Sequence, residues 1–511
     1  MMNSSRRGFL RGAAGFAAAG FAGCAMRPCR KGGKIRLAAV GAWGKGFSDW
    51  MPMVVSGKAE LVALCDCDRG VLANIAAHKG FKATGIDLNK VPFYTDYRRL
   101  LDDASTLGID AMTVSTTDHT HAAIAVRAMK QGIHVYVQKP LVRTLWELDY
   151  FNKTAKEYGV VTQMGNQGSA LPGLRRSVEV LQTGFLGDVR EVHVWTNRPV
   201  WPQGVEAAKL VGGGADKIPA GLDWNAWLGP AKDRPYKDDI PEGAKVHNPW
   251  NIAKKVYHPF NWRGFYDFGC GAFGDMACHT MNLPFRGLEL GLVTSAERIF
   301  VEDAGWDIAY PMKSTVKLTY AARESKVRPG VTLPEVDLYW YDGEQIPSFP
   351  QEIVEVLGTV PKTGCVIIGS NGILCSTNDY GGQSFVALKG EKKTVNLVDH
   401  EAAKTIARSI PFRGDAVDGQ AKGPGAAAVS ADGHYVEFLD AINGEGPVFA
   451  ETGSRCYSDV DFAIPIMEGI LVGCMAQRVS GKLAWDSAAQ TFDNPVANAL
   501  IKPYIRKGFE F

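Results

Sequence analysis

The chain has 511 residues, which is long enough for two or three domains with complete hydrophobic cores. Its 56 basic and 54 acidic residues give a formal net charge of +2, so the overall charge indicates neither a nucleic-acid partner nor an anionic membrane surface. Hydrophobic residues make up 46% of the chain, an ordinary share for a globular protein. Indications of function must therefore come from local motifs.

The first 33 residues are typical of an export leader. Residues 5–10 read Ser-Arg-Arg-Gly-Phe-Leu and precede a run of Gly, Ala and Phe that ends at Ala22. Paired arginines before such a run resemble a twin-arginine signal, with a simple N-terminal arm as the alternative. Residues 21–24, Phe-Ala-Gly-Cys, resemble a lipobox and leave lipid attachment at Cys24 open. We expect residues 1–33 to be a leader and the protein to be periplasmic, with membrane contact only through the leader or a lipid anchor.

A glycine-rich turn organises residues 34–68. The apolar run at residues 35–40 ends in this turn, and a second apolar run at residues 61–64 leads to an acidic residue. Such a strand, turn, helix and strand can hold a dinucleotide, because glycines let the backbone approach a pyrophosphate and the acid accepts ribose hydroxyls. The alternative is an ordinary α/β crossover that turns on glycines. The candidate cofactor-binding residues of this motif are Gly41, Ala42, Trp43, Gly44, Gly46 and Asp66.

Strands and helices alternate through the next hundred residues. Strands are expected at residues 109–115, 133–137 and 160–164, and helices at 70–79, 122–131 and 144–157. This alternation predicts a doubly wound parallel sheet over residues 34–165. Polar residues follow all three strands, at the edge where open α/β sheets bind ligands. The further candidate cofactor-binding residues there are Thr116, Asp118, His121, Gln138, Lys139 and Asn166.

The rhythm changes beyond residue 166. Residues 189–195 alternate with period two, and short strands at 315–320, 336–341 and 365–369 suggest a large antiparallel sheet. Helices are expected at 434–441 and 462–479, and an exposed loop at 408–429. The segment 199–259 is rich in Pro, Gly and Trp and too long for a simple connection. Its tryptophans either line a sugar site or fix the segment through their own packing.

Asp275 and His279 are four residues apart in a helix that is expected to open after a glycine-rich loop. They therefore share one face of that helix, and an imidazole beside a carboxylate is a workable general base. The alternative is a polar contact on a helix surface. Eight cysteines lie beyond the leader without the spacing of a zinc site, so we expect mostly buried thiols and no metal.

These motifs together resemble the glucose-fructose oxidoreductase, inositol dehydrogenase and MocA (Gfo/Idh/MocA) family, and within it the exported branch of sugar-degrading bacteria. The resemblance implies an α/β protein with a Rossmann domain at residues 34–165. It also implies a C-terminal α+β domain at residues 166–511, whose open, mostly antiparallel sheet carries the substrate and often the interface of a homo-oligomer. The stretches that carry the resemblance are residues 40–46, 63–66, 118–121, 134–140, 165–167, 274–279 and 504–509.

The resemblance also implies roles for single residues. Lys139 matches the lysine of the family's Glu-Lys-Pro motif, and Asp275 and His279 match its Asp-x-x-x-His pair. In the implied mechanism His279 takes the proton of a sugar hydroxyl as hydride leaves for a nicotinamide ring, Lys139 donates a hydrogen bond to the developing carbonyl oxygen, and Asp275 orients the hydroxyl or the imidazole. Asp66 favours NAD because a carboxylate repels a ribose 2′-phosphate, while Arg69 keeps NADP open.

Two positions depart from the family pattern. Trp43 stands where a second glycine is expected, and its bulk would crowd a pyrophosphate unless the side chain points outward. Gln138 stands where the family has glutamate, which removes a charge beside Lys139.

Three functions follow from the resemblance and the leader. Outside the cytoplasm no pool of free NAD would recycle the cofactor, which favours one NAD held tightly through catalysis. The first function is an NAD(P)-dependent oxidoreductase that acts on a hydroxyl of a sugar or glycoside. The second is a redox-neutral NAD-dependent glycosidase, similar to the α-N-acetylgalactosaminidases of the family. The third is a non-catalytic sugar-binding lipoprotein with a degenerate cofactor site, for which Trp43 is the one indication.

Overall fold

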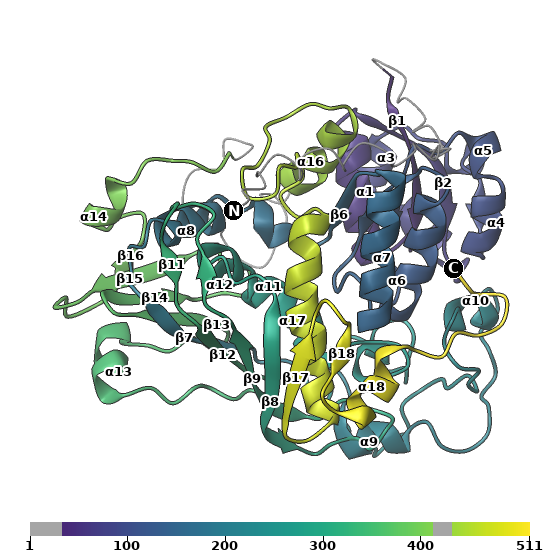
Figure 1. The fold of residues 1–511 in the computed structure, drawn as a ribbon. Coiled ribbons are helices and arrows are strands. Elements are labelled where there is room, and N and C mark those ends of the chain that lie inside the picture. Colours follow the sequence, from purple (N-terminus) through teal and green to yellow (C-terminus); the bar gives the residue numbers. More distant parts are fainter. Residues whose placement is uncertain (1–32, 412–431) are drawn as a thin grey trace, which may run out of the picture.

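The computed structural model describes residues 33–411 and 432–511 and contains two large sheets (Figure 1). The first sheet has six parallel strands in the order β3-β2-β1-β4-β5-β6, which confirms the predicted doubly wound architecture. Its strands are buried on both faces, as the near-continuous apolar runs predict. They are β1 (Ile35–Val40), β2 (Ala59–Cys65), β3 (Phe93–Tyr94), β4 (Ala111–Val114), β5 (His134–Val137) and β6 (Thr162–Met164).

Helices cover both faces of this sheet (Figure 1). The strand order reverses between β1 and β4, so the crevice for a ligand lies at the carboxyl ends of these two strands. The helices are α1 (Lys45–Val55), α2 (Val71–Ala77), α3 (Lys79–Ala83), α4 (Tyr97–Asp102), α5 (Ala104–Leu107), α6 (Asp118–Met129) and α7 (Leu145–Tyr158), with a 3-10 turn, η1, at Leu88–Lys90.

The second sheet has ten strands in the order β16-β15-β14-β13-β7-β12-β9-β8-β17-β18. Its neighbours pair antiparallel except for β7 and β12, so the expectation of a large, mostly antiparallel sheet is confirmed. The strands are β7 (Val189–Trp195), β8 (Val293–Glu302), β9 (Lys313–Tyr320), β12 (Val336–Tyr341), β13 (Gly364–Gly369), β14 (Gly372–Ser376), β15 (Ser384–Leu388), β16 (Val395–Asn396), β17 (Lys482–Asp486) and β18 (Thr491–Phe492). A separate pair joins β10 (Arg323–Glu324) to β11 (Thr332–Leu333).

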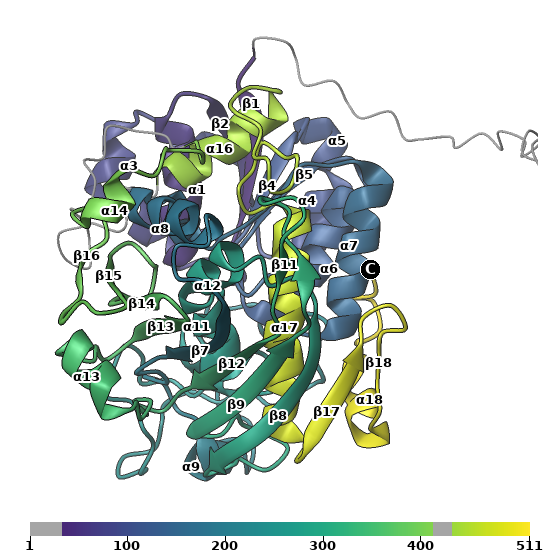
Figure 2. The same cartoon turned by 60° about the vertical axis from the view of Figure 1, so that its left-hand side comes forward.

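One long helix, α17 (Val460–Arg478), lies between the two sheets (Figure 1). Figure 2 shows β8, β9 and β17 crossing in front of it. The helix is long and apolar enough to cross a membrane by length and composition, but 78% of its most apolar window is buried in the protein. A helix that is apolar on all sides is expected to be a core helix in this position.

The remaining helices border the second sheet or connect to it. They are α8 (Pro172–Gln182), α9 (Gly204–Lys209), α10 (Trp224–Leu228), α11 (Gly271–Thr280), α12 (Asn282–Gly287), α13 (Gln351–Leu357), α14 (Glu401–Lys404), α16 (Asp432–Ile442) and α18 (Pro495–Ile501), with 3-10 turns η2 (Gln167–Ala170) and η3 (Asn261–Gly264).

The end of the chain returns to the N-terminal sheet. Helix α16 packs on α1, where Tyr435 and Phe438 join the same apolar cluster as Trp50. The ring of Phe509 lies 6.5 Å from that of Tyr97. The N-terminal core is therefore completed by residues far beyond position 165. The predicted leader and most of the loop expected at 408–429 lie outside the described residues.

Residues 199–263 form a structured insertion, here called the cover segment. Its aromatic side chains build a small core of their own, in which the rings of Trp224 and Trp227 stack with centroids 4.6 Å apart. Tyr257 lies against both rings. Trp224 and Trp227 thus fix the segment by packing on one another, as the second alternative above expects, while Trp227 and Trp262 also line the cavity described below.

Candidate active site

A cavity of about 720 Å³ opens at the switch point between β1 and β4. Gly41 lines it with φ +80°, and a Cβ there would lie 2.3 Å from the carbonyl oxygen of Ser115. Gly46 is equally constrained, since a Cβ would lie 1.7 Å from the Gly41 oxygen. Gly44, at the start of α1, has open space beside it. The turn therefore presents bare backbone and a helix N-terminus to the cavity, as a pyrophosphate requires.

Trp43 does not fill the space beside Gly44. Its ring packs on Phe47, with centroids 5.0 Å apart, and on His78 at 6.2 Å. The side chain forms part of the cavity wall and packs against α1 and the turn after α2. The geometry of the glycine turn is thus compatible with a bulky residue at this position.

Asp66 lies at the end of β2 on the cavity wall. Its Oδ2 accepts a hydrogen bond from the Ala42 amide at 2.9 Å, and its Oδ1 accepts one from the Asp68 amide at 3.1 Å. Burial raises the pKa of Asp66, although these two amides oppose the rise. Arg69 lies over the ring of Phe93 and is not part of the described cavity wall. A ribose at this wall would meet carboxylates, which suits NAD.

The polar residues after β4 divide into two groups. Thr116 lines the cavity. His121 instead holds two loops together, with its ring nitrogens 2.9 Å from the Pro140 oxygen and 3.2 Å from the Thr116 oxygen, and burial lowers its pKa to about 4. Asp118 accepts a hydrogen bond from the Cys270 amide at 3.1 Å, and burial raises its pKa to about 7. Both therefore lie behind the cavity wall.

Gln138 closes a buried polar cluster beneath the glycine turn. Its side-chain amide donates to both carboxylate oxygens of Asp49, at 3.1 and 3.0 Å. Ser115 and Tyr435 donate to the same carboxylate at 2.7 and 3.1 Å, and Lys45 forms an ion pair with it. A glutamate at position 138 could donate nothing to Asp49, so the buried aspartate explains the departure from the family pattern.

The catalytic candidates meet where the two domains join. Lys139 Nζ lies 3.0 Å from both the Oδ1 and the main-chain oxygen of Asp275. Arg263 Nε lies 3.2 Å from the same Oδ1. Burial alone would raise the pKa of Asp275, but the two cations outweigh it and hold that pKa well below its usual range. Asp275 is therefore a fixed negative charge between two positive ones.

His279 lies one helical turn after Asp275 and is 4% exposed. Burial, assisted by the charge of Lys139, lowers its pKa well below the usual value, while Asp275 opposes this. The imidazole is thus neutral at pH 7, and its Nδ1 has no hydrogen-bond partner among the described residues. Tyr380 meets it edge-on, with ring centroids 4.8 Å apart. This is the protonation state that a general base requires.

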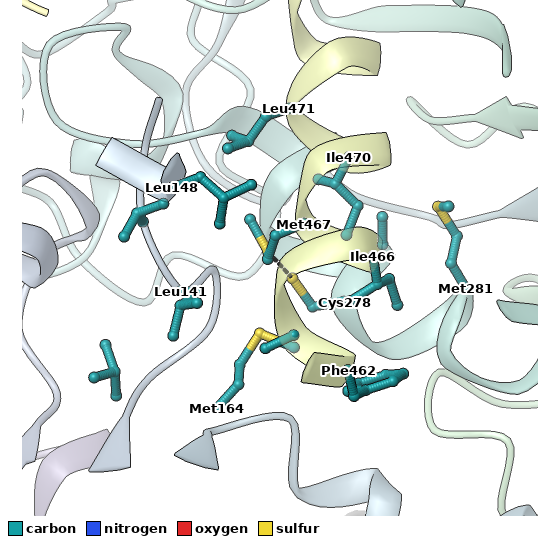
Figure 3. Close-up of a cluster of buried hydrophobic side chains, with 14 of the residues drawn as sticks. Leu141, Leu148, Met164, Cys278, Met281, Phe462, Ile466, Met467, Ile470 and Leu471 are labelled. Carbon is teal, nitrogen blue, oxygen red and sulfur yellow. Dashed lines mark hydrogen bonds between the residues drawn. The ribbon is translucent and has the colours of Figure 1, made fainter. Parts of the chain in front are cut away.

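Helix α11 is held in place by the core between the domains (Figure 3). The Cys278 thiol lies 3.5 Å from the sulfur of Met467 on α17. Ile466 and Phe462 of α17 lie around it in Figure 3. Because all ten residues of α11 are buried, Asp275 and His279 have little freedom to move.

Asn166, after β6, is fully buried, yet neither polar atom of its side chain has a hydrogen-bond partner in the described part of the chain. An amide left in this condition costs free energy. A bound group that reaches this side chain with a donor and an acceptor would remove that cost. Together with the bare glycine turn, Asn166 shows that the residues present fit a dinucleotide cofactor.

The comparisons with known proteins agree with this geometry. Residues 35–166 match the family model described as "Oxidoreductase family, NAD-binding Rossmann fold". The Rossmann domain of the chain therefore belongs to the Gfo/Idh/MocA family. A curated relative, "Inositol 2-dehydrogenase 1" of Saccharopolyspora erythraea, is 30% identical over 31% of this chain and 44% of its own length. "Glycosyl hydrolase family 109 protein 2" of Akkermansia muciniphila is 30% identical over 27% of this chain and 29% of its own length.

These relatives are matched over less than half of their length, so membership of the Gfo/Idh/MocA family rests on the Rossmann domain. For the whole fold, an inositol dehydrogenase homolog from Azotobacter vinelandii, complexed with NADH and myo-inositol, superposes with a TM-score of 0.53. It is 16% identical, and the alignment covers 89% of this chain and 99% of that one. This likeness shows the shared two-domain fold.

The cover segment forms one wall of the cavity at Gly41 and Asp66. The Asp223 amide donates to the Cys67 oxygen at 2.7 Å, and the Arg69 amide donates to the Gly221 oxygen at 3.0 Å. His258 of the cover pairs with Asp68 at 3.6 Å, which lowers the pKa of that carboxyl. The cover is thus bonded to the stretch that directly follows Asp66.

The structure adds two residues to those predicted from sequence. Arg263 has no motif of its own, and only its contact with Asp275 reveals it. Asp49 is the one acidic residue of the largely apolar helix α1, and it is fully buried. A lone acid in an apolar helix was the signal in the sequence that could have indicated a buried polar cluster. No group of three or more His, Cys, Asp or Glu able to hold a metal occurs in residues 33–411 and 432–511.

Proposed function

We propose that this protein is an NAD-dependent oxidoreductase that acts on a hydroxyl group of a sugar or glycoside and keeps its NAD bound through turnover. One observation carries the proposal: Lys139 and Asp275, from different domains, pair at 3.0 Å one helical turn from the neutral His279. The cavity at Gly41 and Asp66 extends to Arg263, which contacts this pair.

The three side chains divide the work on the substrate. His279 is in its base form and accepts the proton of the reacting hydroxyl. Lys139 directs two of its three N–H donors at Asp275, which leaves the third for the substrate oxygen. Asp275 is ionised and stabilises the imidazolium that forms on His279. When bound, NAD supplies the hydride acceptor.

Retention of the cofactor is supported by the cover segment. Main-chain hydrogen bonds at Cys67 and Arg69 attach it on either side of Asp68, next to the wall where a ribose would lie. Any movement of the cover away from this wall would have to break these bonds, so they oppose release of a dinucleotide. We further propose that the protein is exported by the twin-arginine route and acts in the periplasm, where a retained cofactor has no soluble pool to exchange with.

A redox-neutral glycosidase is the second candidate. The same cover favours it, because an enzyme that oxidises and then re-reduces one substrate needs its cofactor to stay bound throughout the cycle. A relative named as a glycosyl hydrolase of family 109 supports this candidate. The third alternative, a non-catalytic binding protein, rested on Trp43 alone. It loses this support because Trp43 leaves the glycine turn open.

The two enzymatic candidates differ in their products. The mature protein is purified and denatured to assay released nucleotide, and the native protein is then given glycosides without added NAD. A keto-sugar, or the absorbance of bound NADH, supports the oxidoreductase. Release of the aglycone without net redox change supports the glycosidase. Absence of both nucleotide and turnover contradicts the two of them.

A further inference from the structure

A row of four side chains leads from the catalytic histidine to the protein surface. This row, here called the collar, consists of Tyr380, Asp379, Arg198 and Trp250. The Tyr380 ring meets His279 edge-on at 4.8 Å. Arg198 Nη2 lies 3.3 Å from Asp379 Oδ2, and the Arg198 guanidinium lies 4.7 Å from the centre of the Trp250 ring.

The two ends of the collar differ sharply in exposure. His279 at its base is 4% exposed, whereas Trp250 is 51% exposed. Arg198 reaches the electrostatic surroundings of the base, because its charge is one of those that, after burial and Lys139, lower the pKa of His279. A ligand that touches both ends therefore extends from the buried base to the surface.

The middle of the collar is polar but almost neutral. Arg198 and Asp379 compensate each other's charge, and both side chains are 15% exposed. Asp379 also accepts a hydrogen bond from Thr363. A guanidinium and a carboxylate side by side offer donors and acceptors at fixed geometry, which suits neighbouring hydroxyl groups better than a charged ligand.

The outer end is apolar. Trp250 is kept in place by the guanidinium that lies against its ring, and Ile252, which is 50% exposed, lies two residues on and lines the cavity. Large apolar side chains that are exposed beside a polar cleft mark a binding surface. An open indole face is the type of surface on which the C–H face of a pyranose ring packs.

We propose that the collar is a subsite for a second sugar ring, so that the substrate is a glycoside of at least two rings. This inference rests on the proposed function, since it places the first ring at Lys139 and His279. The second ring then lies on Trp250, with its hydroxyls on Arg198 and Asp379. A free monosaccharide or cyclitol would use the base of the site and leave the collar empty.

The test compares monosaccharides with the disaccharides that contain them. In Trp250→Ala, kcat/KM for a disaccharide falls about tenfold or more, as expected when an aromatic contact with the ligand is removed, while kcat/KM for the monosaccharide stays unchanged. Trp306→Ala is the matched control, because Trp306 is 58% exposed and lies outside the collar. Equal losses on both substrates, or no loss on the disaccharide, overturn the subsite.

Failure of the proposed function gives a different result. If the wild-type protein holds no nucleotide and turns over no sugar, the enzymatic proposal fails, and the collar is then judged by titration calorimetry with the same disaccharides. Binding that is lost in Trp250→Ala and kept in Trp306→Ala supports the subsite. Absence of binding, or binding that both variants retain, contradicts it.

Discussion

Lys139 and Asp275 form an ion pair of 3.0 Å across the junction of the two domains, although 136 residues separate them in the chain. Lys139 follows a strand of the parallel sheet, while Asp275 lies on α11, which packs on α17. Neither domain alone contains a complete site. The apolar core around Cys278 and Met467 therefore sets the position of the Asp275 carboxylate, to which we assign a role in catalysis (Figure 3).

The first prediction concerns the base. In His279→Ala, turnover falls by roughly 10²–10⁴-fold, the usual contribution of a positioned general base. Bound nucleotide is retained, because His279 does not line the cavity at Gly41 and Asp66. The measurement pairs a turnover assay with extraction of nucleotide from the purified variant. His193→Ala, on the second sheet, is the matched control and stays active; full activity in His279→Ala would refute the role.

The second prediction concerns Asp275. Asp275→Asn removes the charge that Lys139 and Arg263 share and that favours a proton on His279. We expect kcat to fall about 100-fold with little change in bound nucleotide. Steady-state kinetics check this, with Asp461→Asn, an exposed acid on α17, as the control. An unchanged kcat in Asp275→Asn contradicts the assigned role.

Sequence periodicity predicted most of the fold because the elements are strongly patterned. The parallel strands are apolar on both faces, and β12 alternates between buried and half-buried residues as a strand with two different faces does. The half-exposed strand expected at residues 189–195 is instead buried on both faces from Val192 to Trp195, because β7 lies in the middle of the second sheet. Lys139, Asp275 and His279 were found through their resemblance to family motifs. Arg263 was missed because a single arginine in an aromatic stretch has no signature until its partner is known.

The position of the cover segment was beyond sequence reasoning for a different physical reason. It is fixed by main-chain hydrogen bonds between residues about 155 apart, such as Asp223 to Cys67. Such bonds use backbone groups rather than side chains, so the residue types give no sign of them. The clustering of tryptophans signalled a structured segment. It could not distinguish a sugar site from the internal stack of Trp224 on Trp227.

The third prediction concerns the effect of Gln138 on stability. Gln138→Glu places a second carboxylate against Asp49, which is fully buried, and lowers the free energy of unfolding by about 3 kcal/mol. Urea denaturation measures the change. Adding Asp49→Asn restores one amide and one carboxylate and recovers most of the loss. Gln138→Leu, which removes the donor without adding charge, costs only about 1 kcal/mol; an equal cost for both single variants would contradict the account.

The fourth prediction concerns release of the cofactor. His258→Ala breaks the contact between the cover and Asp68, and the rate at which bound nucleotide dissociates rises about two- to fivefold, as expected for a partly exposed polar contact. Competition with excess unlabelled nucleotide measures this rate. His247→Ala is the control, since His247 bonds to Pro199 within the cover itself. Equal rates in wild type and His258→Ala would show that this pair does not hold the cover.

The fifth prediction concerns pH and Asp118. Burial raises the pKa of this carboxyl to about 7 in the folded state, against an ordinary value of 3.8. The folded protein therefore keeps a proton that the unfolded chain loses, and stability from this group is full below pH 3.8 and is lost as the pH rises through 7. In Asp118→Asn the side chain has no ionisable group, and its amide oxygen can still accept the hydrogen bond from the Cys270 amide.

The free energy of unfolding of Asp118→Asn should therefore equal that of wild type near pH 4. At pH 8 it should exceed the wild-type value by up to about 4 kcal/mol, since each pKa unit corresponds to about 1.4 kcal/mol. Urea unfolding at several pH values between 5 and 8 checks this. A stability difference for Asp118→Asn that stays constant across this range would mean that the buried carboxyl is already ionised in the folded protein. In that case the charges of Arg263 and Lys139, which lower its pKa, outweigh its burial.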